Sequence, residues 1–157
     1  MALVVEDGTG IAGANTYLSV AELRAFAVDR GVTLPAQDSD VATLLVKACD
    51  YLELKSYIGV RASDSQGLSW PRLETVYTGI PAKLKTAQSL LAIEAQNGDL
   101  SSAVRPNPYV QTKIDVVYIK YASTNDVASG MRFYAVDSLL DGLLSVSGGR
   151  PLVTVRA

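Results

Sequence analysis

The sequence contains no histidine and only one cysteine among its 157 residues. Histidine is the commonest general base and the commonest metal ligand, so its absence removes most familiar catalytic and metal-binding arrangements. The single cysteine, Cys49, cannot form an intrachain disulfide, and its apolar helical surroundings predict a buried thiol. We therefore expect no catalytic, cofactor-binding or metal-binding residues, and we do not expect an enzyme.

Long hydrophobic runs and a strong net charge are also missing. No stretch approaches the roughly 18 to 20 apolar residues that a membrane span requires, and the first eight residues lack the basic start of a secretory signal. We expect a soluble protein with no membrane partner. Fourteen Lys and Arg residues stand against sixteen Asp and Glu residues, a net charge of −2, which gives no overall attraction to nucleic acid.

Helical periodicity dominates what is present. With 48% hydrophobic residues, the chain can bury the core of one compact domain. Ser19 and Glu22 have the spacing of a capping box and predict the start of a first helix. Apolar residues at helical spacing predict a second helix from about 38–40 to 57. On that helix Tyr51 and Leu54 widen the apolar surface, which predicts contacts with more than one neighbour.

A long loop and a third helix follow in the sequence. Residues 59–79 contain three glycines without sustained periodicity, so we predict an ordered loop. Trp70 is expected to anchor this loop to the helices, and the alternative is that it stacks on a ligand. Pro81 opens the third helix, in the first turn where its missing donor does no harm. The inner face of this helix is predicted to be Leu84, Ala87, Leu91 and Ala95.

The last third of the sequence adds β character. Residues 114–121 are rich in β-branched and aromatic side chains and predict a strand. A short helix follows, and its predicted core face is Val136, Leu139, Leu140, Leu143 and Leu144. We predict a mainly α (α+β) fold: a small helical bundle over residues 1–147, with the long loop, a β-strand or hairpin, and a flexible or strand-forming tail over residues 148–157.

Two segments are candidate partner-binding surfaces. The tail cannot satisfy its own backbone polar groups, so we expect it to pair with a sheet edge. Its candidate partner-binding residues are Arg150, Leu152, Val153, Val155 and Arg156. Residues 55–85 carry five Lys and Arg against two acids, a bias that fits phosphates, the acids of a partner, or a plain solvated surface. The candidate charged contact residues are Arg61, Arg72, Lys83 and Lys85.

Short motifs are spread over nearly the whole chain. They are residues 5–10 (VEDGTG), 13–22 (GANTYLSVAE), 48–52 (ACDYL), 66–72 (QGLSWPR), 80–81 (IP), 118–122 (YIKYA), 135–140 (AVDSLL), 148–149 (GG) and 152–156 (LVTVR). In order and spacing they resemble the head–tail connector (adaptor) family of tailed bacteriophages. That family includes sequences labelled DnaT-like single-stranded-DNA-binding proteins.

The resemblance implies a structural virion protein, a neck adaptor assembled in the host cytoplasm. Its partners would be its own copies in a dodecameric ring, the portal protein, and a stopper or tail-completion protein. Double-stranded DNA would pass through the ring. The alternative is a single-stranded-DNA-binding (DnaT-like) module. Rings in micrographs favour the adaptor, which we expect, and salt-sensitive oligonucleotide binding favours the alternative.

Overall fold

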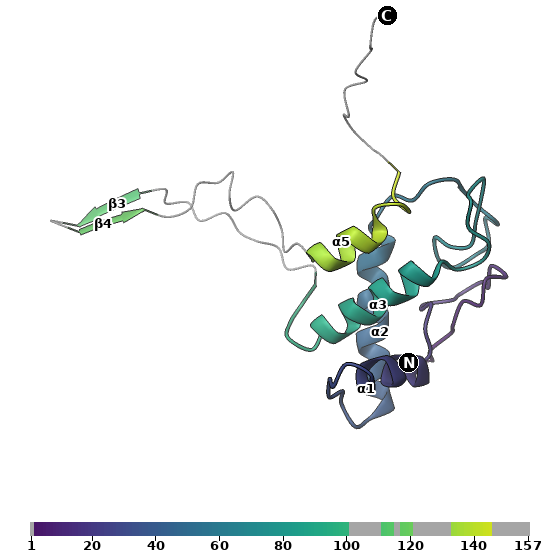
Figure 1. Cartoon of the computed structure of the whole chain (residues 1–157), viewed down its shortest axis with the longest axis horizontal. Coiled ribbons are helices and arrows are strands. Elements are labelled where there is room, and N and C mark those ends of the chain that lie inside the picture. Colours follow the sequence, from purple (N-terminus) through teal and green to yellow (C-terminus); the bar gives the residue numbers. More distant parts are fainter. Residues whose placement is uncertain (1, 101–110, 115–116, 121–132, 146–157) are drawn as a thin grey trace, which may run out of the picture.

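The computed structural model describes residues 2–100, 111–114, 117–120 and 133–145. Over these ranges the protein is mainly helical with some β structure, which confirms the predicted fold class. The helices are α1 (Val20–Val28), α2 (Asp38–Glu53), α3 (Ala82–Glu94) and α5 (Tyr134–Leu140). The strands are β1 (Val60–Arg61), β2 (Arg72–Leu73), β3 (Gln111–Ile114) and β4 (Val117–Lys120). Helix α3 lies across α2, and α5 packs on α3 (Figure 1).

Helix α1 starts at the predicted capping box. The Glu22 backbone N–H donates to the Ser19 hydroxyl at 3.2 Å, and the Ser19 backbone N–H donates to the Glu22 carboxylate at 2.7 Å. Two of the backbone donors exposed at a helix start are satisfied in this way. The second Glu22 oxygen lies 3.2 Å from Lys85 Nζ, so the same residue also ties α1 to α3.

Helix α2 ends at Glu53, earlier than the predicted end at residue 57. The reason is a tertiary contact that periodicity does not reveal. Tyr57 forms an isolated antiparallel bridge with Leu144, and its hydroxyl donates to the Leu52 carbonyl at 2.9 Å. The same carbonyl also accepts from the Lys55 backbone N–H at 3.0 Å, so local bonds and the Tyr57 hydroxyl together close the last turn before the chain turns toward α5.

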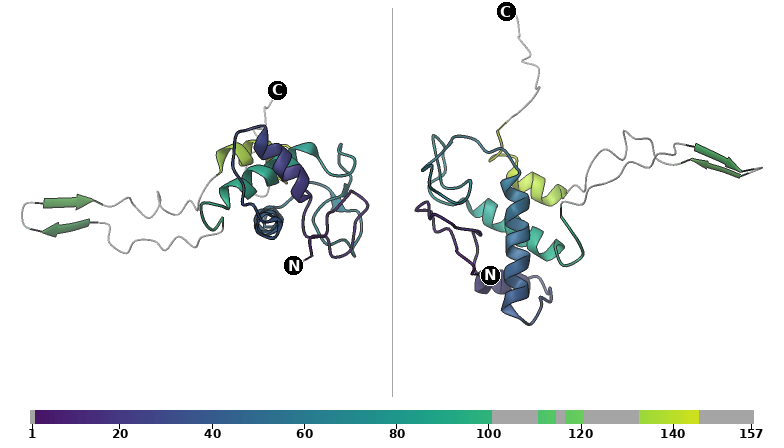
Figure 2. Two further views of the ribbon diagram at one scale, coloured as in Figure 1. Left: turned by 90° about the horizontal axis from the view of Figure 1, so that it is seen from below. Right: turned by 180° about the vertical axis from the view of Figure 1, so that it is seen from behind.

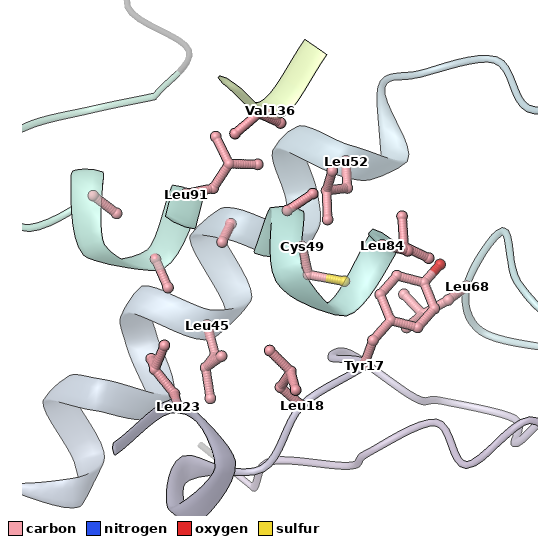
Figure 3. Close-up of a cluster of buried hydrophobic side chains, with 14 of the residues drawn as sticks. Tyr17, Leu18, Leu23, Leu45, Cys49, Leu52, Leu68, Leu84, Leu91 and Val136 are labelled. Atoms are coloured by element: carbon pink, nitrogen blue, oxygen red, sulfur yellow. The ribbon is translucent and has the colours of Figure 1, made fainter. Parts of the chain in front are cut away.

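The hydrophobic core lies between α2 and α3 and is closed by α5 (Figure 3). The predicted inner face of α3 is confirmed, because all four of its residues are buried. On the last helix and the turn after it, Val136, Leu140 and Leu143 are buried. Leu139 and Leu144 are only partly buried against the core. The predicted burial of the Cys49 thiol is also confirmed, and Figure 3 shows it on α2 facing α3.

One buried amide connects the N-terminal segment to this core. Gln88, on α3, donates to the Thr16 hydroxyl at 2.8 Å and to the Leu45 carbonyl at 3.0 Å. Its side-chain oxygen accepts from the Tyr17 backbone N–H at 3.1 Å. The amide thus satisfies polar groups of α2 and of the segment before α1. This lets α2, α3 and that segment pack together with these polar groups paired.

The segment 59–79 is an ordered loop, as predicted, that contains one short antiparallel ladder. In this ladder Val60 pairs with Leu73 and Arg61 pairs with Arg72. Trp70 has 0% exposure, and its ring makes edge contacts with Tyr57, just before the loop, and with Tyr77, near its end. The predicted anchoring role of Trp70 is therefore confirmed.

The prediction of a single strand over 114–121 was wrong, and the alternative of a hairpin is correct. Ile114 pairs with Val117, and Gln111 pairs with Lys120. The chain reverses direction between Ile114 and Val117. The residues of the apolar run are therefore divided between two strands, which composition alone cannot separate. Among the named elements, β3 and β4 contact only each other, and they are drawn apart from the helices in Figure 1.

Candidate functional site

The two arginines among the candidate charged residues hold the backbone of their own loop. Arg72 donates to the carbonyls of Ile58 at 2.6 Å, Gly59 at 2.7 Å and Ser69 at 3.1 Å. Arg61 donates to two further carbonyls of the same loop. Because charged donors make strong hydrogen bonds to these backbone carbonyls, both guanidinium groups are structural members of this loop.

The other candidates have separate places. Lys83 is exposed in the first turn of α3, and Lys85, also at the start of α3, forms the ion pair with Glu22. That these two lysines and the two loop arginines act as one contact surface stays a prediction. The five tail candidates from Arg150 to Arg156 lie outside the described residues.

A different set of cationic and aromatic side chains lies together where α2 approaches α5. The rings of Tyr51 and Phe133 are in edge contact, with centres 5.5 Å apart and planes at 89°. Lys55 Nζ lies 4.8 Å from the centre of the Tyr51 ring and 3.7 Å from Asp137 of α5. Lys47 is exposed one helical turn before Tyr51, so a cation stands on each side of this ring.

We call this set, together with Tyr134, which follows Phe133 in the chain, the α2–α5 surface; its residues are Lys47, Tyr51, Lys55, Phe133 and Tyr134. Tyr134 starts α5 and is 75% exposed. Seen from behind, α2 lies in front of α3, and α5 crosses beside its upper end (Figure 2, right).

Beside Tyr51 the surface is hollowed. The hollow has a volume of about 250 Å³ and is lined by Lys47, Asp50, Tyr51, Leu54, Asp99 and Leu100. Four of these residues come from one face of α2, at spacings of three and four residues, and the last two come from the segment after α3. The sequence indicates the widened apolar face of α2 but not the hollow that this face lines. The missed signal is the spacing of Lys47, Tyr51 and Lys55 at four-residue intervals.

A half-buried carboxylate elsewhere has structural partners. Glu53, at the end of α2, accepts from the Tyr17 hydroxyl at 2.6 Å and from the backbone N–H and hydroxyl of Ser69 at 2.8 and 2.7 Å. Burial, together with the Glu53 charge, raises the pKa of Tyr17, so its hydroxyl remains a donor. In the described ranges no three His, Cys, Asp or Glu side chains are placed to hold a metal ion, and no helix there is long and apolar enough to span a membrane.

The comparison with protein families bears on the two functions that the sequence left open. Residues 1–157 match the model of the family described as "Putative DnaT-like ssDNA binding protein". The chain belongs to this family. No curated protein and no solved structure is significantly similar to it.

The expectation of a head–tail adaptor is therefore wrong. The matched family is described by single-stranded-DNA binding, and nothing supports a virion ring, a portal or stopper partner, or passage of double-stranded DNA. The physical reason is that the motifs behind the resemblance have roles inside one chain. In residues 5–10 the Glu6 carboxylate accepts from three backbone N–H groups. Ser19 caps α1, and Trp70 anchors a loop. Motifs with such roles indicate that two chains share a fold, but they do not indicate that the chains share a binding partner.

Proposed function

We propose that the chain is a non-catalytic single-stranded-DNA-binding protein and that the α2–α5 surface is its binding site. The observation that carries this proposal is the contact between the Tyr51 ring, the Phe133 ring and the Lys55 ammonium group. Aromatic rings with adjacent cations are the common means by which proteins hold single strands without reading a sequence. The family description supports the same function.

The aromatic and the cationic side chains of this surface would contact different parts of the DNA strand. The exposed ring of Tyr134 and the half-buried ring of Tyr51 offer faces on which bases stack. Lys47 and Lys55 lie within reach of the phosphates on either side. Lys55 is already partly neutralised by Asp137, and the whole chain carries a charge of −2. Stacking must therefore contribute more to the binding free energy than charge does.

The test uses two substitutions at the surface and two matched controls. Tyr134→Ala removes an exposed ring at little cost to the fold, and Tyr134→Phe keeps the ring and removes only the hydroxyl. Lys47→Ala removes an exposed cation of the surface, and Lys83→Ala removes an exposed cation at the start of α3. The affinity for a fluorescent single-stranded oligonucleotide is measured by anisotropy, and circular dichroism verifies the fold of each variant.

We expect Tyr134→Ala to weaken binding by roughly 5- to 150-fold, which corresponds to the ~1–3 kcal/mol that one stacked base contributes. Tyr134→Phe should bind like the wild type. Lys47→Ala should bind more weakly than Lys83→Ala. If Lys83→Ala binds more weakly than Lys47→Ala and Tyr134→Ala binds like the wild type, the binding site does not lie on the α2–α5 surface.

A further inference from the structure

The hollow beside Tyr51 combines an apolar wall with a charged rim. Leu100 is 5% exposed and Leu54 is 73% exposed, so its apolar lining runs from the core to the surface next to the Tyr51 ring. Its polar lining is Lys47, Asp50 and Asp99. A ligand that fills such a space needs a flat apolar face and an edge that forms hydrogen bonds.

The charges in the lining decide which part of a nucleotide can enter. Asp50 brings a carboxylate to the lining of the hollow, three residues from Lys47 on the same helix. A phosphate placed there would be repelled by this carboxylate. It can instead remain outside, near Lys47 at the rim. The part of the nucleotide that fits the hollow is therefore the base, with one face of its ring against the Tyr51 side chain.

Asp50 gives the hollow a preference among bases. Its side chain is exposed on α2, and no ion pair or hydrogen bond joins its carboxylate to another described side chain. An ionised carboxylate only accepts hydrogen bonds. It can accept from the exocyclic amino group of cytosine or adenine, whereas thymine presents a carbonyl oxygen at the corresponding position.

We infer that the hollow binds one base of a single strand and prefers cytosine and adenine over thymine through a hydrogen bond from the exocyclic amino group to the Asp50 carboxylate. This inference rests on the proposed function, because it assigns a base preference to the same α2–α5 surface.

The experiment compares two oligonucleotides that differ only at the edge of the base. Strands of 5-methyldeoxycytidine and of thymidine carry the same methyl group on the same kind of ring, so differences in stacking are small. Their affinities are measured with the wild type, with Asp50→Asn, and with Asp64→Asn. Asp64 is an exposed acid of the loop 59–79, and its substitution controls for the change in net charge.

We expect the wild type and Asp64→Asn to bind the 5-methyldeoxycytidine strand about three- to tenfold more tightly than the thymidine strand, the net contribution of one typical hydrogen bond. Asp50→Asn should bind both strands with nearly equal affinity, because an amide can both donate and accept. Equal affinities in the wild type, or a preference that persists in Asp50→Asn, would overturn this inference and leave the proposed function intact. Failure of the wild type to bind either strand would overturn both.

Discussion

At the scale of single residues, Trp70 shows how one side chain can hold a long loop in place. Its ring lies 6.0 Å from the Tyr57 ring and 6.1 Å from the Tyr77 ring, centre to centre, in edge contacts on two sides. Among the described residues its indole N–H has no hydrogen-bond partner. The residue therefore stabilises the loop through its buried apolar area and its ring contacts.

This account predicts different effects for two substitutions of Trp70. Trp70→Ala should lower the free energy of unfolding by about 3–5 kcal/mol, the usual cost of removing a large buried aromatic side chain. Trp70→Phe should cost clearly less, because a ring remains and no hydrogen bond is lost. Urea unfolding followed by circular dichroism measures both, since the only tryptophan is removed as a fluorescent probe. A Trp70→Ala variant as stable as the wild type would refute the anchoring role.

The burial of Trp70 could be predicted from its size and apolar character, but the burial of Glu6 could not. Carboxylates are expected at the surface, and the sequence shows no charge that would pair with this one. Its partners are the backbone N–H groups of Gly8, Gly10 and Ile11, at 2.7 to 2.9 Å. Backbone donors of this kind exist only once the loop has folded, so a residue pattern does not reveal them.

At the scale of secondary-structure elements, the end of α2 is tied to the loop 59–79 by Glu53. This carboxylate accepts two hydrogen bonds from Ser69 and one from the fully buried Tyr17. Its removal leaves a buried hydroxyl and a backbone N–H without acceptors, which costs about 1–3 kcal/mol for each group. The loop should be the first part of the chain to loosen.

We predict that Glu53→Ala speeds tryptic cleavage after Arg61 and Arg72, because both bonds lie in this loop. Asp64→Ala removes an exposed acid of the same loop and should leave the cleavage rate unchanged. Limited proteolysis under native conditions, read by mass spectrometry, measures the rates at the two sites. Equal rates in the wild type and Glu53→Ala would show that Glu53 does not hold the loop.

Elements that depend on local sequence could be predicted, and those that depend on tertiary contacts could not. The Ser19–Glu22 capping box lies within four consecutive residues, and the inner face of α3 follows from periodicity alone. The end of α2 depends on Tyr57, which bonds back to Leu52 and pairs with Leu144. The ladder between β1 and β2 has two pairs, too few to leave an alternating pattern in the sequence.

At the scale of the whole molecule, net charge does not decide whether the chain can bind nucleic acid. A total of −2 averages over cations with very different surroundings. Arg61 and Arg72 bond to backbone carbonyls, whereas Lys47 is exposed beside an aromatic ring. What matters for binding is which cations are available at one surface, and that depends on the packing of α5 near α2.

The central claim is that single-stranded DNA binds at the α2–α5 surface mainly by stacking, and a salt series tests it most directly. Affinity for a single-stranded oligonucleotide is measured from roughly 50 to 200 mM salt, the range over which counterion release changes affinity strongly. With two lysines in contact with phosphates, the logarithmic slope should be about −1.4, a loss of roughly sevenfold across the series. Lys47→Ala should make the slope shallower by about 0.7. Absence of binding at the lowest salt, or a slope steeper than about −4, which needs roughly six phosphate contacts, would contradict the account.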